Sequence, residues 1–172
     1  MTFMSILRRF TSIRLSAVIL SNMFISELYL HAVTGNVDLS LSDSTIANDY
    51  AQLSAVTGRV EVSLDSLTYI SPDFAWELST STGRVELDLN QNIAESFNDS
   101  LRLFNIHTST GRVDINSDLH QDYGLQIHAN CATGSILLPN GDEGYYTTHD
   151  FDNSNWKYFF DLSTSTGSIK FD

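Results

Sequence analysis

The chain has 172 residues and a mass of 19.2 kDa, which is enough for one domain with a substantial core. Its 21 acidic and 9 basic residues give a formal charge of −12, which argues against a nucleic-acid binder and against attachment to anionic lipid through basic side chains. The single cysteine excludes an intrachain disulfide and a cysteine zinc site, and 42% hydrophobic residues is typical of a globular chain.

The N-terminal segment, residues 1–27, contains the longest apolar stretch, Leu15–Ile25, which three arginines precede. This stretch is about half of the ~20 residues that a membrane span needs, so no membrane span is predicted. Basic residues before an apolar segment are typical of a signal peptide, but Phe24 stands where cleavage after Ser26 requires a small residue. We therefore expect residues 1–27 to form an N-terminal strand or cap, with a degenerate first coil as one form of it. The compartment stays open between cytoplasm and cell envelope.

Residues 28–172 carry an internal repeat centred on the dipeptide Thr-Gly. The dipeptide occurs six times, and its glycines are Gly35, Gly58, Gly83, Gly111, Gly134 and Gly167. The intervals between successive glycines are similar, except that the last one, from Gly134 to Gly167, is longer than the others. Three copies are nearly identical and read ELSTSTGRVELDL, NIHTSTGRVDINS and DLSTSTGSIKFD. Recurrence at this period predicts stacked structural repeats, because one such unit cannot bury its apolar face alone.

Apolar and polar residues alternate on both sides of each repeat glycine. The positions seven and five before it, and two and four after it, are apolar in all six copies. A period of two is typical of β-strands, and glycine permits a turn with positive φ, so each repeat is predicted as strand, turn, strand. Small residues occupy the third position before each glycine, which we interpret as the inner corner of the turn: Ala32, Ala55, Thr80, Thr108, Cys131 and Thr164. Cys131 is then a small buried residue rather than a nucleophile.

The predicted fold is all-β, a single-stranded β-helix (β-solenoid) of about six coils with a Thr-Gly turn in each. Equivalent strands of successive coils then lie about 4.8 Å apart. Residues 28–172 form one solenoid domain in this prediction. The longest spacing, between Gly134 and Gly167, indicates an inserted loop at about residues 140–159, which we expect near the last coil.

Tandem coils reading LSTSTGRVEL and LSTSTGSIKF resemble the putative-adhesin β-solenoid domain, also called the toast-rack domain. The resemblance extends over roughly Leu28–Asp172 and depends on the sixfold recurrence of a short motif. It implies a single-stranded β-helix with a non-enzymatic role, often attached to membrane segments or signalling modules in bacteria and archaea. It brings no catalytic residues.

Two charged columns are the first candidate site. Arg59, Arg84 and Arg112 directly follow their repeat glycines, and the acidic residues Glu61, Glu86 and Asp114 come two residues later, on the same face of the strand. These columns are either a solvated face with mutually compensating ion pairs, or a charged stripe that recognises a partner.

The aromatic residues of the inserted loop are the second candidate. Those chosen as partner anchors are Tyr145, Tyr146, Trp156 and Tyr158, because tyrosine and tryptophan dominate interface hot spots. The alternative is a terminal cap that covers the last coil.

No catalytic, cofactor-binding or metal-binding residue is predicted. The five histidines show no metal-ligand spacing, and no GxSxG nucleophile motif occurs. The sequence favours a non-enzymatic interaction or scaffold module whose partner is a protein or a surface glycan. Two alternatives remain: a filament subunit that self-associates through the solenoid ends, and a carbohydrate-active β-helix enzyme.

Overall fold

The computed structural model describes residues 18–47, 49–92, 99–139 and 144–172. This part of the chain is nearly all β-strand and has no α-helix, which confirms the all-β prediction. The strands are β1 (Val18–Ser21), β2 (Phe24–Ile25), β3 (Leu28–Ser42), β4 (Thr45–Ile46), β5 (Tyr50–Asp65), β6 (Thr68–Tyr69), β7 (Asp73–Gln91), β8 (Ser100–Leu119), β9 (Tyr123–Leu137), β10 (Tyr145–Thr147) and β11 (Trp156–Phe171). A short 3₁₀ helix, η1 (Phe151–Asn153), lies between β10 and β11.

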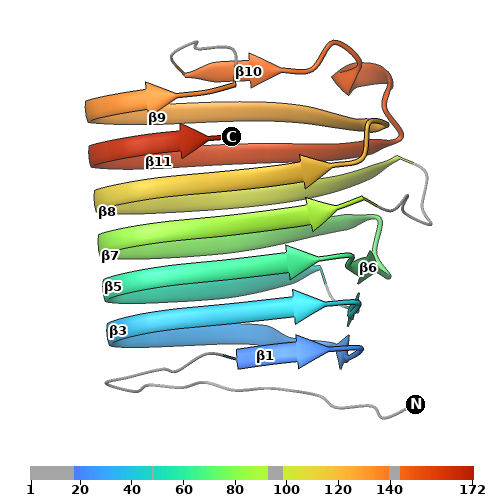
Figure 1. The fold of residues 1–172 in the computed structure, drawn as a ribbon, viewed down its shortest axis with the longest axis horizontal. Coiled ribbons are helices and arrows are strands. Elements are labelled where there is room, and N and C mark those ends of the chain that lie inside the picture. The colour runs from blue at the N-terminus through green and yellow to red at the C-terminus, as the bar shows by residue number, and fades with distance from the viewer. Residues whose placement is uncertain (1–17, 48, 93–98, 140–143) are drawn as a thin grey trace.

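Each of the six long strands contains one Thr-Gly repeat and is folded back on itself. Figure 1 shows these ribbons turning at one edge of the molecule, so that the two arms of each strand lie in a front and a back layer. The repeat glycines have φ between +115° and +148°, a region that favours glycine. The predicted apolar columns face the space between the layers, and all their members are buried except Ile136, which is half-buried.

The turns stack so closely that a side chain has no room at the glycine positions. A Cβ atom on Gly83 would lie 1.7 Å from the carbonyl oxygen of Gly58 in the neighbouring strand. The residues of the predicted inner corner are buried, except Cys131, which is half-buried. In two of the three TST triplets the first threonine bonds within its own turn: Thr80 donates from Oγ1 to the Thr82 carbonyl at 3.3 Å, and Thr164 donates to the Thr166 carbonyl at 3.2 Å. Positive φ and close backbone approach thus both require glycine in these turns.

The long strands pair in parallel with the repeat glycines in register. The eight-stranded sheet has the order β1-β3-β5-β7-β8-β11-β9-β10, so the last strand of the chain lies between β8 and β9 (Figure 1). The alternative in which the inserted loop caps the last coil therefore applies to β9, the end of the stack, and not to β11, the last repeat in the sequence. β9 is the outermost repeat, and β10 pairs antiparallel to it along Gln126–His128. This order is permitted because β11 presents the same apolar pattern to β8 and to β9.

A second sheet of three short parallel strands, β2-β4-β6, accompanies the first repeats. The two sheets do not close into one, and the six-coil solenoid stays a prediction. Most of the predicted N-terminal cap, residues 1–17, lies outside the described residues. From residue 18 onward, β1 pairs with β3 and β2 pairs with β4.

Aromatic rings fill the core of the middle repeats. Trp76 and Phe104 stack with ring centroids 6.3 Å apart, and Phe104 stacks on Phe160 at 4.8 Å. All three rings are fully buried. The contact between Phe104 and Phe160 joins β8 to β11 and so anchors the last strand in the interior of the stack.

Candidate functional site

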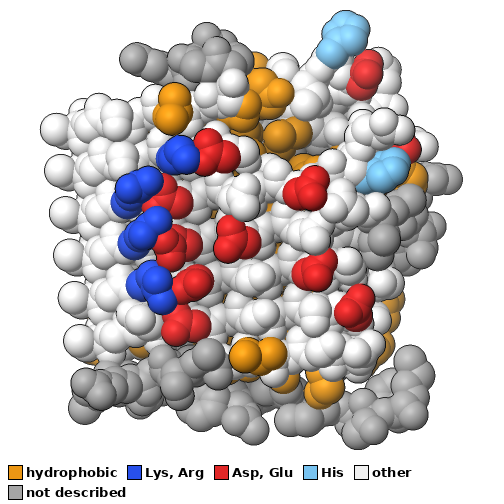
Figure 2. Space-filling view, in the orientation of Figure 1, with side chains coloured by type: hydrophobic (Ala, Val, Ile, Leu, Met, Phe, Trp, Pro, Cys, Tyr) orange, Lys and Arg blue, Asp and Glu red, His pale blue; other side chains and the backbone are white. Residues whose placement is uncertain are grey.

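The arginine and acidic columns lie on the front layer, next to the turns. Arg59, Arg84 and Arg112 occupy equivalent positions in β5, β7 and β8, and the acids follow the same register. Figure 2 shows the basic side chains as a stripe with an acidic stripe beside it. The structure thus brings together the six charged residues that the sequence singled out.

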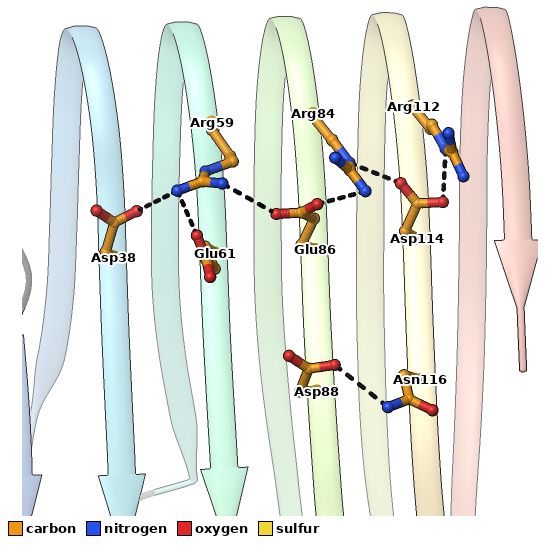
Figure 3. A network of polar contacts seen from close by, with 9 residues as sticks. All are labelled: Asp38, Arg59, Glu61, Arg84, Glu86, Asp88, Arg112, Asp114 and Asn116. Atoms are coloured by element: carbon orange, nitrogen blue, oxygen red, sulfur yellow. Dashed lines mark hydrogen bonds and ion pairs between the residues drawn. The ribbon is translucent and has the colours of Figure 1, made fainter.

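These side chains form a continuous network of ion pairs, the charged ladder (Figure 3). Arg84 bridges its own strand and the next, with Nε 2.7 Å from Asp114 and an Nη atom on Glu86. Asp114 also accepts from Nε of Arg112 at 2.6 Å. The members of the ladder are Asp38, Arg59, Glu61, Arg84, Glu86, Arg112 and Asp114.

Asp38 extends the ladder onto β3, where no arginine follows the glycine. Its carboxylate lies 3.8 Å from Nη2 of Arg59, and Arg59 also reaches Glu86 through Nη1 at 3.4 Å. The sequence alignment contained the signal for Asp38, because this residue occupies the same column as Glu61. The ladder therefore crosses four strands, β3, β5, β7 and β8.

Charge sharing in the ladder affects the protonation of Arg84. Partial desolvation lowers the pKa of Arg84, but the hydrogen bond and charge of Asp114, together with Glu86, outweigh it and raise the pKa above its ordinary value. The side chains of Arg84 and Arg112 remain 44% and 49% exposed. The ladder is thus a surface of paired charges, four acids with three arginines, that solvent still reaches.

A shallow groove of about 330 Å³ is lined in part by the ladder residues Arg84, Glu86 and Asp114. Asp88 and Asn116 are linked across it by a hydrogen bond of 3.4 Å (Figure 3). Its lining is almost entirely charged or amide side chains, including Lys170 and Asp172. Most of these groups already pair with one another, so the groove offers few uncommitted charges.

The four aromatic candidates of the loop do not form one exposed cluster. Tyr145 is 48% exposed, whereas Tyr146 and Trp156 are half-buried. Tyr158 is fully buried, so its selection as a surface anchor was wrong. It lies nine positions before Gly167, and odd offsets before the glycine point into the core, as Phe160 does. The alternation that predicted the strands thus already placed Tyr158 inside.

Phe159, between two buried residues, is the aromatic side chain of β11 that faces outward. It belongs to an in-register row on the back layer, called the outer row: Tyr50, Ala75, Leu103 and Phe159. All four are half-buried at positions where other outward columns are polar. Neither charge nor loop position marks this row in the sequence, but its four members all lie eight positions before a repeat glycine.

Polar side chains flank the outer row. Tyr50 donates its phenolic hydrogen to Glu77, and burial followed by this bond and the charge of Glu77 raises the Tyr50 pKa. At the other end, the ring of His128 packs edge-on against Phe159 at 4.9 Å and lies 5.1 Å from the ring of Tyr145.

The outer row ends in a pocket of about 450 Å³ at the C-terminal repeats. Its apolar lining comes from Leu101, Phe151 and Phe159, and its polar lining from Asp73, Asp99, Ser100, Gln126 and Lys157. The ammonium of Lys157 lies 3.6 Å from the carboxylate of Asp99. The pocket thus combines apolar surface with several hydrogen-bonding side chains, and ligand pockets use both kinds of group.

Arg102 carries a charged group of the kind used in binding sites, but here that group is buried and bonds to other parts of the fold. Its side chain is fully buried, and Nη1 donates to the carbonyl of Pro72 at 2.6 Å. Its guanidinium also lies 4.1 Å from the ring centroid of Tyr69. Arg102 occupies the inward column of Phe74 and Tyr158, so it ties the segment before β7 to β8.

No known family model matches this chain, and no curated protein matches its sequence. Among solved structures, the chain is similar to the crystal structure of a "putative cell adhesion protein" from Clostridium sporogenes, with a TM-score of 0.55 and 17% sequence identity. The similarity covers 74% of this chain and 55% of the other, so the chain spans about half the length of that protein. At this identity the likeness shows a related fold alone.

The described part of the chain holds no helix with the length and apolarity needed to cross a membrane.

Proposed function

We propose that this chain is a non-enzymatic interaction module of the adhesin type, built as a β-solenoid of six coils. The observation that carries the proposal is the in-register stack, which holds long rows of side chains in fixed positions on two flat layers. Repeat proteins commonly use such extended surfaces for binding. The fold likeness to a protein named for cell adhesion supports the same proposal.

The charged ladder fits a supporting role in this function. Its three arginines pair with four acids over four strands, so most of its charges are already engaged with one another. Exposed pairs of this kind contribute little to stability, about 0–1 kcal/mol each. We infer that the ladder shapes and solvates the front layer, and that partner contact depends on other surfaces as well.

The proposal predicts reversible binding without turnover. The purified chain is immobilised on a biosensor and exposed to protein and polysaccharide fractions of the cell envelope of its source organism. We expect saturable binding of one fraction, with no release of reducing sugar from that fraction. Release of sugar in proportion to the chain added would support the carbohydrate-active enzyme instead. Failure of every fraction to bind would contradict the interaction module.

Self-association is the remaining alternative. β10 covers part of the outermost repeat through a short antiparallel pair, which favours a closed end. We expect light scattering after size exclusion to give the mass of a monomer, 19.2 kDa, from micromolar to near-millimolar protein. Growth of the mass with concentration would favour the filament subunit.

A further inference from the structure

The outer row and its terminal pocket form a surface that the charged ladder does not explain. Tyr50, Ala75, Leu103 and Phe159 lie on adjacent strands, so the row extends about 14 Å across the sheet at the spacing of paired strands. An outward apolar row with a polar rim on a protein surface is typical of an interaction site. The pocket at its end has a volume within the range of roughly 300–1,000 Å³ usual for ligand sites.

We propose that the outer row and the pocket bind a neutral oligosaccharide, with one sugar ring stacked on Phe159 and its hydroxyl groups bound by the pocket rim. This proposal rests on the proposed function as an interaction module and names its partner class. A sugar ring has an apolar C–H face and a rim of hydroxyl groups. Phe159 and Leu101 match the face, while Asp73, Gln126 and Lys157 supply acceptors and donors for the rim.

The negative charges around the pocket argue against an acidic glycan as its ligand. Asp73 and Asp99 line the pocket together with one lysine, and Lys157 already engages Asp99 at 3.6 Å. Asp161 stands on β11 beside Phe159 on the same outward side, and the whole chain carries a formal charge of −12. An anionic chain would thus meet repulsion along this surface. A neutral sugar meets acceptors for its hydroxyl groups without that penalty.

The pairing of the strands argues against an extended peptide as the ligand of the outer row. Peptides that lie along a sheet usually gain affinity by pairing their main chain with an open strand edge. The outer row lies on a sheet face, where β7, β8 and β11 are each paired on both sides. Recognition here must therefore come from side chains, as it does for sugars. Glu77, one of the carboxylates beside the row on β7, already accepts a hydrogen bond from the hydroxyl of Tyr50.

The test uses the isotope-labelled full chain and three neutral probes, cellohexaose, N-acetylchitohexaose and mannohexaose, with pentalysine as the peptide probe. We expect one or more of the sugars at millimolar concentration to shift the NMR signals of Leu101, Leu103 and Phe159 in a saturable way. Signals of Arg84 and Arg112, on the opposite layer, should not move. No shift with any of the three sugars would overturn the proposal, and so would shifts of the row by pentalysine alone.

Point variants can distinguish the loss of sugar stacking from a loss of folding. Phe159→Ala should weaken binding about tenfold or more, and Phe159→Tyr should restore it, because both rings offer a stacking face. Asp73→Asn changes an exposed side chain, so it should weaken binding severalfold while the melting temperature stays unchanged. Ser163→Ala, an exposed residue farther along β11, is the matched control and should bind as the parent does. Equal affinity of Phe159→Ala and Asp73→Asn with the parent would overturn the site.

The sugar titration and the biosensor experiment with envelope fractions together distinguish two kinds of failure. If the sugars leave the outer row unmoved but an envelope fraction still binds the immobilised chain, the interaction module stands and the sugar site is wrong. If neither the sugars nor any envelope fraction binds, both proposals fail together.

Discussion

The repeats in β3, β5 and β7 stack in the order in which the chain makes them, whereas those in β8, β9 and β11 do not. In the first region each long strand is accompanied by a short strand of the second sheet, β2, β4 or β6. In the second region the short sheet is absent among the described residues, and the last strand enters the stack between two earlier ones. The difference shows that matching repeat patterns define which rows align but do not define which strands become neighbours.

The two regions also differ in the strand that borders their outermost repeat. β3 is bordered by β1, which pairs in parallel along Leu39–Ser42. β9 is bordered by β10, which pairs antiparallel and only along Gln126–His128. The second region therefore contains both the irregular connection and the outermost repeat, and it also holds the pocket proposed to bind sugar.

Deletion of residues 156–172 should have the largest effect, because it removes the middle of the second region rather than its end. β8 and β9 each lose a neighbour, and Phe160, Leu162 and Phe171 leave the core. We expect the amides of β9 and β10 to lose hydrogen-exchange protection while those of β3 and β5 keep it. Full protection of β9 in the shortened chain would mean that β9 can take the place of β11 on β8.

Substitution of a turn glycine should be the most damaging point change. Gly83→Ala places a Cβ 1.7 Å from the Gly58 oxygen at a φ of +144°, and Gly167→Ala does the same at 1.6 Å from the Gly111 oxygen. We expect each to lower the free energy of unfolding by at least about 4 kcal/mol, measured by urea denaturation. Ser81→Ala, an exposed neighbour in the turn, should change it by less than about 0.5 kcal/mol. A mild effect at Gly167 alone would mean that the second region is packed more loosely than the first.

Arg102 joins the two regions across the pair β7–β8. Arg102→Met should lower the free energy of unfolding by about 1–3 kcal/mol, because the carbonyls of Ser71 and Pro72 lose the charged donor that the buried Arg102 provides. The exposed Arg112→Met should cost clearly less, which thermal denaturation of both variants can show. Equal losses would indicate that Arg102 stabilises the protein through its aliphatic stem alone.

The charged ladder should contribute less than any of these. Arg84→Ala should lower the free energy of unfolding by about 1 kcal/mol or less, and the loss should shrink in high salt as the pairs with Glu86 and Asp114 are screened. A loss that does not depend on salt would show that Arg84 acts through packing.

Tyr50 should have an effect only at alkaline pH. Its pKa is raised in the folded state, so above the ordinary value of 10.0 the unfolded chain ionises more readily than the folded one. Stability should therefore fall more steeply with pH above about 10 in the parent than in Tyr50→Phe. Urea denaturation between pH 8 and 11 measures the difference, and parallel curves would contradict it.

Much of the fold can be predicted from the repeat, because the offset of a residue from its repeat glycine determines whether its side chain points into the core or out of it. Alternation around the glycines places Val85 and Phe104 inside and Arg84 and Glu86 outside, as the structure has them. The same alternation places Arg102 and Tyr158 inside, which a reading by residue type overlooks. The position of β11 does not follow from the pattern, because every repeat offers its neighbours the same apolar columns. The outer row depends on that position, since Phe159 meets Leu103 only when β11 lies on β8.

The position of β11 between β8 and β9 also has a consequence for folding during synthesis. β9 leaves the ribosome before β11 does, and at that moment β8 presents an unpaired edge with the register that β9 fits. A chain that pairs these two strands early must separate them again before β11 can enter. We therefore expect the second region to fold more slowly than the first, where the strands stack in the order of the sequence.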